Sequence, residues 1–195
     1  LSARSGLLVK DRLAFEQSRQ IEYVIFDKTG TLTRGEHELV SVYTVGDLEE
    51  DRALTLAAAA EADSEHMISR GLVRAARRRG LPLPPASSFE YLAGRGVRAV
   101  VDNQELQVGG PNLLSHLEIT PPPALRSAAS EAGSRGETVI YLVKDNSVQA
   151  VLSFADVVRE ESREAVSALK ERGIRVAMLT GDSEAVAQQV ALELT

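Results

Sequence analysis

A single aspartate, Asp27, stands where a run of strand-forming residues ends and a polar segment begins. The residues before it, Tyr23–Phe26, form a short continuous apolar run of the kind found in buried strands. Those after it, Lys28–Thr33, supply a lysine, a glycine and three hydroxyl groups. Open α/β sheets bind ligands beyond the carboxyl ends of their strands, where backbone N–H groups cradle phosphate. Asp27 is therefore a candidate nucleophile toward a phosphoryl group, a reaction that would give an aspartyl-phosphate.

A second strand-to-loop junction lies near the other end of the chain. A helical pattern spans 156–172, the apolar run Ile174–Leu179 follows, and Thr180-Gly181-Asp182 comes next. Helix, strand, polar loop and helix in succession indicate a parallel sheet with helices on its faces. In that arrangement the Thr180 hydroxyl reaches the phosphoryl group on Asp27. The simpler alternative is that Asp27 caps a turn and Thr180 caps a helix.

The middle of the chain has a different character. Ala-rich helical patterns alternate with short β-like stretches, and Asp102-Asn103 separates two of these as a hairpin turn would. We expect an α/β Rossmann-type domain, truncated on its C-terminal side, with an inserted α+β domain. The expected boundaries are 1–35 and 154–195 for the two parts of the α/β domain and 36–153 for the insert. The expected elements of the insert are strands at 38–45, 89–92, 97–101, 106–108, 138–143 and 148–154 and helices at 48–62 and 64–79, with a short helix after Pro123.

Composition narrows the class of protein. Of the 195 residues, 44% are hydrophobic and 26% are charged, which is typical of a globular protein. The formal net charge of −6 gives no basic footprint for nucleic acid, and the absence of cysteine excludes disulfides. No apolar run is long enough to cross a bilayer. The chain begins without Met and stops within a helical pattern, so we expect a soluble, monomeric piece of a longer protein.

Three motifs together resemble a known family. Asp27-Lys28-Thr29-Gly30-Thr31-Leu32-Thr33 resembles the phosphorylation signature of P-type ATPases, whose phosphorylation domain has a haloacid-dehalogenase-like fold. Thr180-Gly181-Asp182 resembles the second phosphate-binding loop of that family. Asp156-Val157-Val158-Arg159 resembles the segment where the chain re-enters the phosphorylation domain. The resemblance implies that Lys28 and Thr180 stabilise charge on the phosphoryl group, and that Asp182 orients the nucleotide or the Mg²⁺ shell.

The identity of residue 29 separates two kinds of enzyme within that superfamily. The soluble phosphatases place a second aspartate two residues after the nucleophile, where it acts as general acid and base. Thr29 stands there in this chain and has no carboxylate. The resemblance therefore favours a pump with a long-lived aspartyl-phosphate over a soluble phosphatase, with Mg²⁺ held at Asp27 and Thr29.

The insert resembles the nucleotide-binding domain of heavy-metal (P1B-type) ATPases. Ser64-Glu65-His66 matches the motif that places a glutamate and a histidine beside adenine, and Gly94-Arg95-Gly96 matches the turn that lets the backbone approach the nucleotide. Met67 departs from the family, which usually has Pro there. Gly109–Asn112 resembles a later glycine-containing turn. The resemblance implies ATP contacts at Glu65, His66, Gly94, Gly96 and Asn112.

These motifs imply an ATP-binding and phosphorylation unit on the cytoplasmic face of a membrane, in a metal-transporting parent whose transmembrane and actuator domains are its partners. A soluble phosphatase and a nucleotide-binding module without turnover are the alternatives. The family's phosphorylation domain also has a later Lys and a Gly-Asp-Gly-x-Asn-Asp loop, and neither follows Asp182 here. We therefore expect the isolated piece to bind nucleotide but to phosphorylate poorly.

Overall fold

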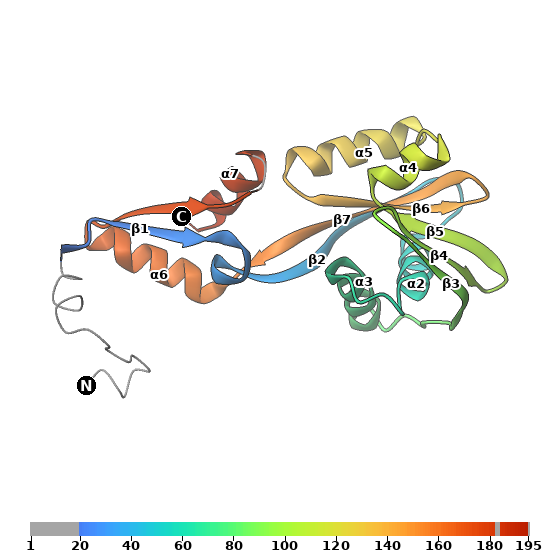
Figure 1. Ribbon diagram of the computed structural model, residues 1–195, viewed down its shortest axis with the longest axis horizontal. Coiled ribbons are helices and arrows are strands. Elements are labelled where there is room, and N and C mark those ends of the chain that lie inside the picture. The colour runs from blue at the N-terminus through green and yellow to red at the C-terminus, as the bar shows by residue number, and fades with distance from the viewer. Residues whose placement is uncertain (1–19, 182–183, 195) are drawn as a thin grey trace.

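Two lobes joined by a pair of long strands make up the protein, as Figure 1 shows. The computed structural model describes residues 20–181 and 184–194. Residues 10–20 also have a helical pattern in the sequence, and this segment apart from its last residue lies outside them, as do Asp182, Ser183 and Thr195. In chain order the elements are β1 (Tyr23–Asp27), the Asp27 loop (Lys28–Leu32), β2 (Thr33–Thr44), α2 (Glu50–Ala60), α3 (Met67–Arg78), β3 (Ala86–Leu92), β4 (Gly96–Val101), β5 (Gln104–Gly109), α4 (Pro111–Leu117), α5 (Pro123–Ser134), β6 (Thr138–Lys144), β7 (Ser147–Val158), α6 (Glu160–Glu171), β8 (Arg175–Leu179) and α7 (Glu184–Glu193).

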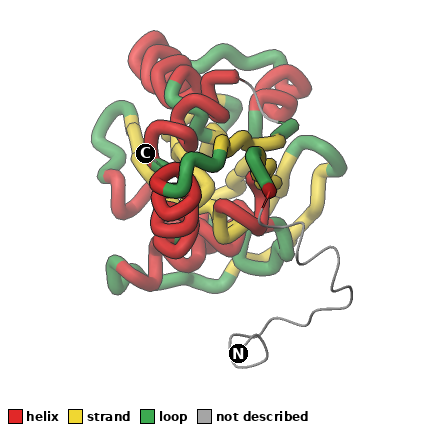
Figure 2. The backbone as a smooth tube through the Cα atoms, turned by 90° about the vertical axis from the view of Figure 1, so that its left-hand side faces the viewer, coloured by secondary structure: helices red, strands yellow, loops and turns green. Residues whose placement is uncertain are grey.

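The larger lobe has a central antiparallel sheet in the order β2-β7-β6-β5-β4-β3. Helices α2 and α3 cover one face, and α4 and α5 cover the other, so the lobe has three layers (Figures 1 and 2). Along β6 the side chains alternate between the two cores. Ile140 and Leu142 pack with the α2–α3 core, and Tyr141 and Val143 pack with the α4–α5 core. Burial on both faces explains why this strand is a continuous apolar run rather than an alternating one.

Two hairpins of this sheet follow from their turn residues. Asp102 and Asn103 join β4 to β5 with φ of 49° and 60°, and Asp145 and Asn146 join β6 to β7 with φ of 49° and 57°. Asp and Asn tolerate this left-handed backbone, which two-residue hairpin turns require. The hairpin turn expected at Asp102-Asn103 is therefore confirmed.

The smaller lobe is the parallel pair β1–β8 with α6 and α7 packed on it. Phe26, Val176 and Met178 turn toward these helices and join a core with Leu32, Val166 and Val190. The other face of the pair is open, since Ile25 is 67% exposed and Leu179 is 66% exposed. The expectation that both strands are buried is wrong for this face, because the described helices of the lobe pack only on the opposite one. None of the helices in the described parts of the chain is both long and apolar enough to span a bilayer.

The lobes are connected through β2 and β7, which pair antiparallel from Thr33 opposite Val158 to Thr44 opposite Ala150. The expected domain boundaries, 35/36 and 153/154, fall inside these two strands and remain a prediction. The pairing has register shifts between Thr33 and His37 and between Leu39 and Ser41, so the two lobes are joined by an irregular two-stranded ribbon.

Candidate active site

Asp27 and Thr180 lie at the same edge of the small sheet. In the parallel pair, Asp27 at the end of β1 is in register with Leu179 at the end of β8. Thr180 is the next residue after Leu179, so both polar loops leave the sheet together. Asp27 is exposed while Phe26 turns inward, which leaves the carboxylate accessible to a ligand. The structure thus brings together these two residues as the sequence predicted.

The loop after Asp27 is tied to the start of α6 by one arginine. Arg159 donates from Nε to the carbonyl of Thr33 at 3.0 Å and from Nη2 to that of Gly30 at 3.3 Å, and its backbone N–H donates to Leu32 at 2.9 Å. Gly30 has φ of 79°, a left-handed conformation that glycine adopts without steric cost. Arg159, far along the chain from this loop, therefore fixes the shape of the Asp27 loop.

Lys28, the residue after the predicted nucleophile, is buried and close to an acidic side chain. Its side chain is buried, and its ammonium lies 3.6 Å from Oδ2 of Asp156. Asp27 is exposed whereas Lys28 is buried, so the two side chains lie in different surroundings. This ammonium, which the sequence predicts on the phosphoryl group, thus has a carboxylate of β7 nearby, and its role toward a phosphoryl group remains a prediction. Asp156, noticed in the sequence only as part of the re-entry motif, is the residue that holds it.

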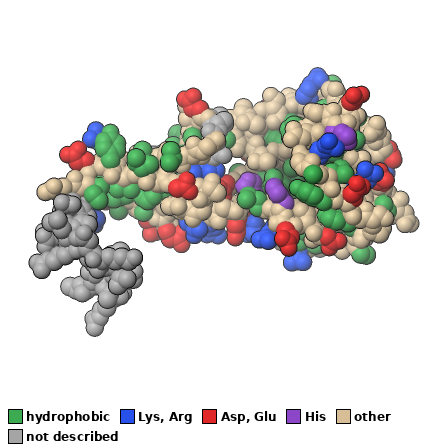
Figure 3. Space-filling view, in the orientation of Figure 1, with side chains coloured by type: hydrophobic (Ala, Val, Ile, Leu, Met, Phe, Trp, Pro, Cys, Tyr) green, Lys and Arg blue, Asp and Glu red, His purple; other side chains and the backbone are tan. Residues whose placement is uncertain are grey.

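Thr33 completes this buried group. Its hydroxyl donates to Oδ2 of Asp156 at 2.6 Å and lies 3.1 Å from the carbonyl of Lys28. Figure 3 shows basic, acidic and histidine side chains close together on the surface where the smaller lobe meets the larger one. Lys28, Thr33 and Asp156 therefore connect the Asp27 loop to both long strands.

Replacing Thr33 by Val should lower the free energy of unfolding by about 1–3 kcal/mol, because a buried carboxylate loses a donor while the side-chain volume is kept. Chemical denaturation of the chain measures this change. Thr31→Val, at an exposed position in the same loop, is the control and should change stability by less than about 0.5 kcal/mol. Equal effects of the two substitutions would contradict a stabilising role for the buried hydroxyl.

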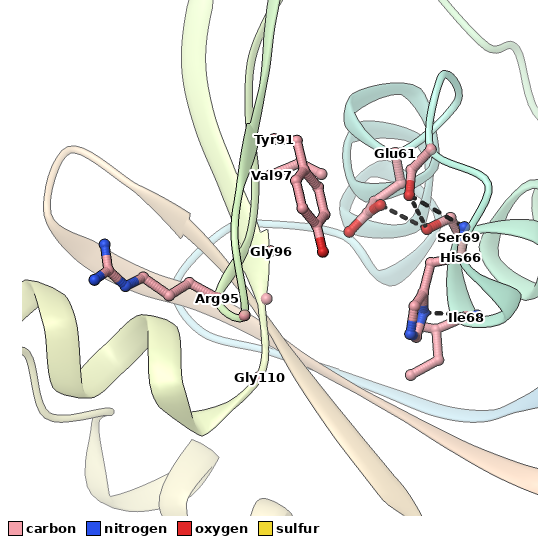
Figure 4. Close-up of a pocket in the computed structure, with 12 residues that line it drawn as sticks. Glu61, His66, Ile68, Ser69, Tyr91, Arg95, Gly96, Val97 and Gly110 are labelled. Carbon is pink, nitrogen blue, oxygen red and sulfur yellow. Dashed lines mark hydrogen bonds between the residues drawn. The ribbon is translucent and has the colours of Figure 1, made fainter.

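A second candidate site lies in the larger lobe, where a cavity of about 260 Å³ opens between the ends of the helices and the strands β3–β5 (Figure 4). His66, Gly94 and Gly96 line it, as predicted for nucleotide contacts. Glu65 is exposed and is not among the lining residues. The complete lining consists of Glu61, Ser64, His66, Ile68, Ser69, Tyr91, Gly94, Arg95, Gly96, Val97, Gly109 and Gly110.

His66 is oriented by the helix that it caps. Its Nδ1 accepts a hydrogen bond from the backbone N–H of Ile68 at 3.3 Å, at the N-cap of α3. In the neutral ring this assigns the proton to Nε2, which is then a donor. The cap fixes the ring direction without the proline that the family usually has at position 67. Met67 therefore does not remove the orientation of His66.

Glu61 also lines the cavity, although none of the sequence motifs includes it. It is buried directly after α2, and its carboxylate accepts from the Ser69 hydroxyl at 2.6 Å. Burial raises the pKa of Glu61 above its ordinary value, although hydrogen bonds from Ser69 and Ser64 and the nearby charge of His66 act in the opposite direction. A buried carboxyl in a cavity with a raised pKa is typical of functional sites. The available sequence signal was an acidic residue directly after the apolar run Ala57–Ala60.

The raised pKa has a consequence for stability. The folded protein holds the Glu61 proton more tightly than the unfolded chain, so this stabilisation is complete at low pH and is lost as the pH rises through the raised pKa. Glu61→Gln should therefore melt at a higher temperature than the wild type at neutral pH, and the difference should shrink below the ordinary glutamate pKa. Thermal melts from about pH 4 to pH 8 measure it, with exposed Glu65→Gln as control. A melting difference for Glu61→Gln that does not change with pH would count against a raised pKa.

Two polar side chains lie at the glycine turn beside the cavity. The side-chain amide of Asn112 donates to the carbonyl of Gly94 at 3.2 Å, so Asn112 supports the turn from α4. Asn112 is not one of the lining residues, and the N-cap of α4 is Gly110. The Arg95 side chain turns away from the cavity, as Figure 4 shows. Its Nη1 lies 3.4 Å from Nε2 of His116.

A magnesium ion fits the donor set at the strand ends. Among the described residues no group of three or more His, Cys, Asp or Glu side chains could hold a metal ion. Mg²⁺ in nucleotide sites is usually bound by one or two carboxylates together with phosphate oxygens and water. Exposed Asp27 supplies one such carboxylate. The predicted contributions of Thr29 and of Asp182, which lies outside the described residues, remain predictions.

Comparison with known proteins gives the family. The model for haloacid dehalogenase-like hydrolases matches residues 21–195. The chain belongs to this family. Within it, the chain is 40% identical over 194 residues to copper-exporting P-type ATPase B of Archaeoglobus fulgidus, covering 100% of this chain and 27% of the relative. It is also 40% identical to a probable copper-exporting P-type ATPase V of Mycobacterium tuberculosis, covering 98% and 25%.

Solved structures agree with this assignment. A crystal structure of a zinc-transporting PIB-type ATPase in its E2.Pi state superposes with a TM-score of 0.88 and 32% identity, over 99% of this chain and 31% of that one. The resemblance to heavy-metal P-type ATPases and the haloacid-dehalogenase-like fold class are therefore confirmed. This haloacid dehalogenase-like chain spans about a quarter of the length of the curated relatives that it matches.

Proposed function

We propose that the chain is the ATP-binding and phosphorylation unit of a heavy-metal cation-transporting P-type ATPase. The observation that carries the proposal is the register of β1 and β8, which sets Asp27 beside Thr180 at one sheet edge, in a chain whose second lobe contains the His66 cavity. One lobe then holds the nucleotide, and the other accepts its terminal phosphoryl group. In the parent, this unit would lie on the cytoplasmic face of the membrane. The parent's membrane and actuator domains would use the reaction to move the ion.

The chemical step is a transfer between two oxygens. A carboxylate oxygen of Asp27 attacks the γ-phosphorus of ATP, the bond to the β–γ bridging oxygen breaks, and ADP leaves with that electron pair. Mg²⁺ bound at Asp27 would neutralise negative charge on the phosphate oxygens. The Thr180 hydroxyl and the N–H groups of the Asp27 loop donate hydrogen bonds to the transferred group. The loop is kept in shape by Arg159.

The contacts of the predicted residues suggest a specific role for each of them in this reaction. Lys28 acts through its ion pair with Asp156, as a positioning residue for the loop. His66 contacts the base, with Nε2–H as the donor, while Gly94 and Gly96 let the backbone come close to the nucleotide. We assign the carboxylate beside the base to Glu61 rather than Glu65, because Glu61 lines the cavity.

The test is phosphorylation of the intact transporter with γ-labelled ATP and Mg²⁺. An acid-stable label that is released by hydroxylamine is expected, since acyl phosphates react with that nucleophile. Rapid release of phosphate from small phosphate esters, without a trapped label, would favour a phosphatase. Nucleotide binding with neither label nor hydrolysis would reduce the proposal to a binding module.

A further inference from the structure

Tyr91 is an aromatic residue in the nucleotide cavity that none of the motifs includes. In β3 it stands opposite Val97 of β4, and opposed residues of antiparallel strands share a face. Val97 is buried in the α2–α3 core, and Phe89, two residues earlier on β3, packs against the same core. Tyr91 is on that face as well, yet it is 65% exposed. It lies beyond the packed core, where the cavity begins.

The ring faces the residues that are assigned to the base. Figure 4 shows Tyr91 on the strand side of the cavity with its hydroxyl pointing inward, and Glu61 and His66 on the helical side. Gly94 and Gly96 form the adjoining wall and present no side chains. A flat, polarisable surface thus lies across the cavity from a carboxylate and an imidazole, with open space between them. This arrangement suits a planar heterocycle with polar edges.

We propose that Tyr91 is a stacking residue for the nucleobase and makes the cavity select for a planar base. The proposal rests on the proposed function, because it assumes that nucleotide occupies this cavity. Every nucleobase has a π-face that an aromatic ring can cover, and such contacts contribute measurably to affinity. Removing the large exposed ring leaves the edge contacts of Glu61 and His66 but uncovers one face of the base.

Titration calorimetry of the chain with MgATP tests the proposal. Tyr91→Leu should weaken ATP binding about tenfold, whereas Tyr91→Phe, which keeps the ring, should bind like the wild type. Inorganic tripolyphosphate has no base, so its affinity should be the same for all three proteins. Tyr91 is exposed, so all three should fold alike, and thermal melts check this.

Tyr91→Trp provides a second readout, because the chain has no tryptophan of its own. Its emission should change when ATP is added, as the indole stacks on the base, and should not change with tripolyphosphate. The matched control is Tyr23→Leu, at an exposed tyrosine of the small lobe whose ring contacts Arg175 at 3.8 Å. That variant should bind ATP like the wild type.

The outcomes separate this proposal from the proposed function. ATP binding that is weakened by His66→Ala but unchanged by Tyr91→Leu would overturn the stacking role alone. Equal losses for Tyr91→Phe and Tyr91→Leu would also overturn it, since the hydroxyl rather than the ring would then matter. Absence of ATP binding by the wild type would overturn both.

Discussion

Asp27→Asn should reduce the acid-stable phosphate label of the intact transporter to background. The amide has no anionic oxygen to attack phosphorus, so no acyl phosphate forms at position 27. Asp27 is exposed at the end of β1, and the amide has nearly the same shape, so folding and ATP affinity should be kept. The comparison therefore separates loss of the nucleophile from loss of the fold.

The measurement is the amount of hydroxylamine-sensitive label per mole of protein, with ATP affinity measured on the same preparation. Asp145→Asn is the matched control, because Asp145 lies in the distant β6–β7 turn with φ of 49°, where Asn is equally suited. It should be labelled like the wild type. Undiminished label in Asp27→Asn would show that another residue accepts the phosphoryl group, and the assignment of Asp27 would be rejected.

Gly96→Ala should destabilise the larger lobe by several kcal/mol and abolish ATP binding with it. Gly96 has φ of 137°, and an added Cβ would lie 2.0 Å from the carbonyl oxygen of Val108 and 2.7 Å from Cα of Gly109. Both obstacles are backbone atoms of the neighbouring strand β5, so the hairpin itself must move. Strained backbone and forced repacking each cost about 1–3 kcal/mol. The predicted nucleotide glycine is thus also a structural requirement of the β4–β5 pair.

Gly94→Ala is the matched control for that prediction. No atom lies within 4 Å of the position of an added Cβ at Gly94, and only its φ of 69° opposes the substitution. We expect a loss of about 1 kcal/mol, with folding kept. Chemical denaturation of both variants measures the difference. Comparable stability of the two variants would mean that the strands separate at little cost, contrary to the close approach at Gly96.

Much of the candidate site was accessible from the order of residues. The apolar run before Asp27 and the one before Thr180 have lengths and compositions typical of buried strands, so the sequence predicts their polar neighbours at strand ends. Parallel pairing then follows from the intervening elements, and the observed register confirms it. The hairpin at Asp102-Asn103 was predictable for a similar reason, since the turn type depends on local backbone preferences.

Other parts of the site depended on contacts between distant segments. The partner of Lys28 is Asp156 in β7, and no local pattern shows which carboxylate a buried ammonium will meet. Glu61 belongs to the cavity because α2 ends against Ser69 of α3, while the adjacent candidate Glu65 turns to solvent. Tyr91 belongs there because the core stops short of it.

The sequence by itself determined the strand-end positions of Asp27 and Thr180, the polar loops that follow them, and the presence of a glycine turn and of a histidine at a helix start in the middle of the chain. These features depend on local backbone preference, strand length and residue chemistry, which act over a few neighbouring residues. Only the tertiary structure decided which carboxylate faces the cavity, which one holds Lys28, and why Gly96 admits no side chain. Those outcomes depend on burial and on the close approach of strands and helices that are far apart along the chain, and such approaches are fixed only when the whole fold is packed.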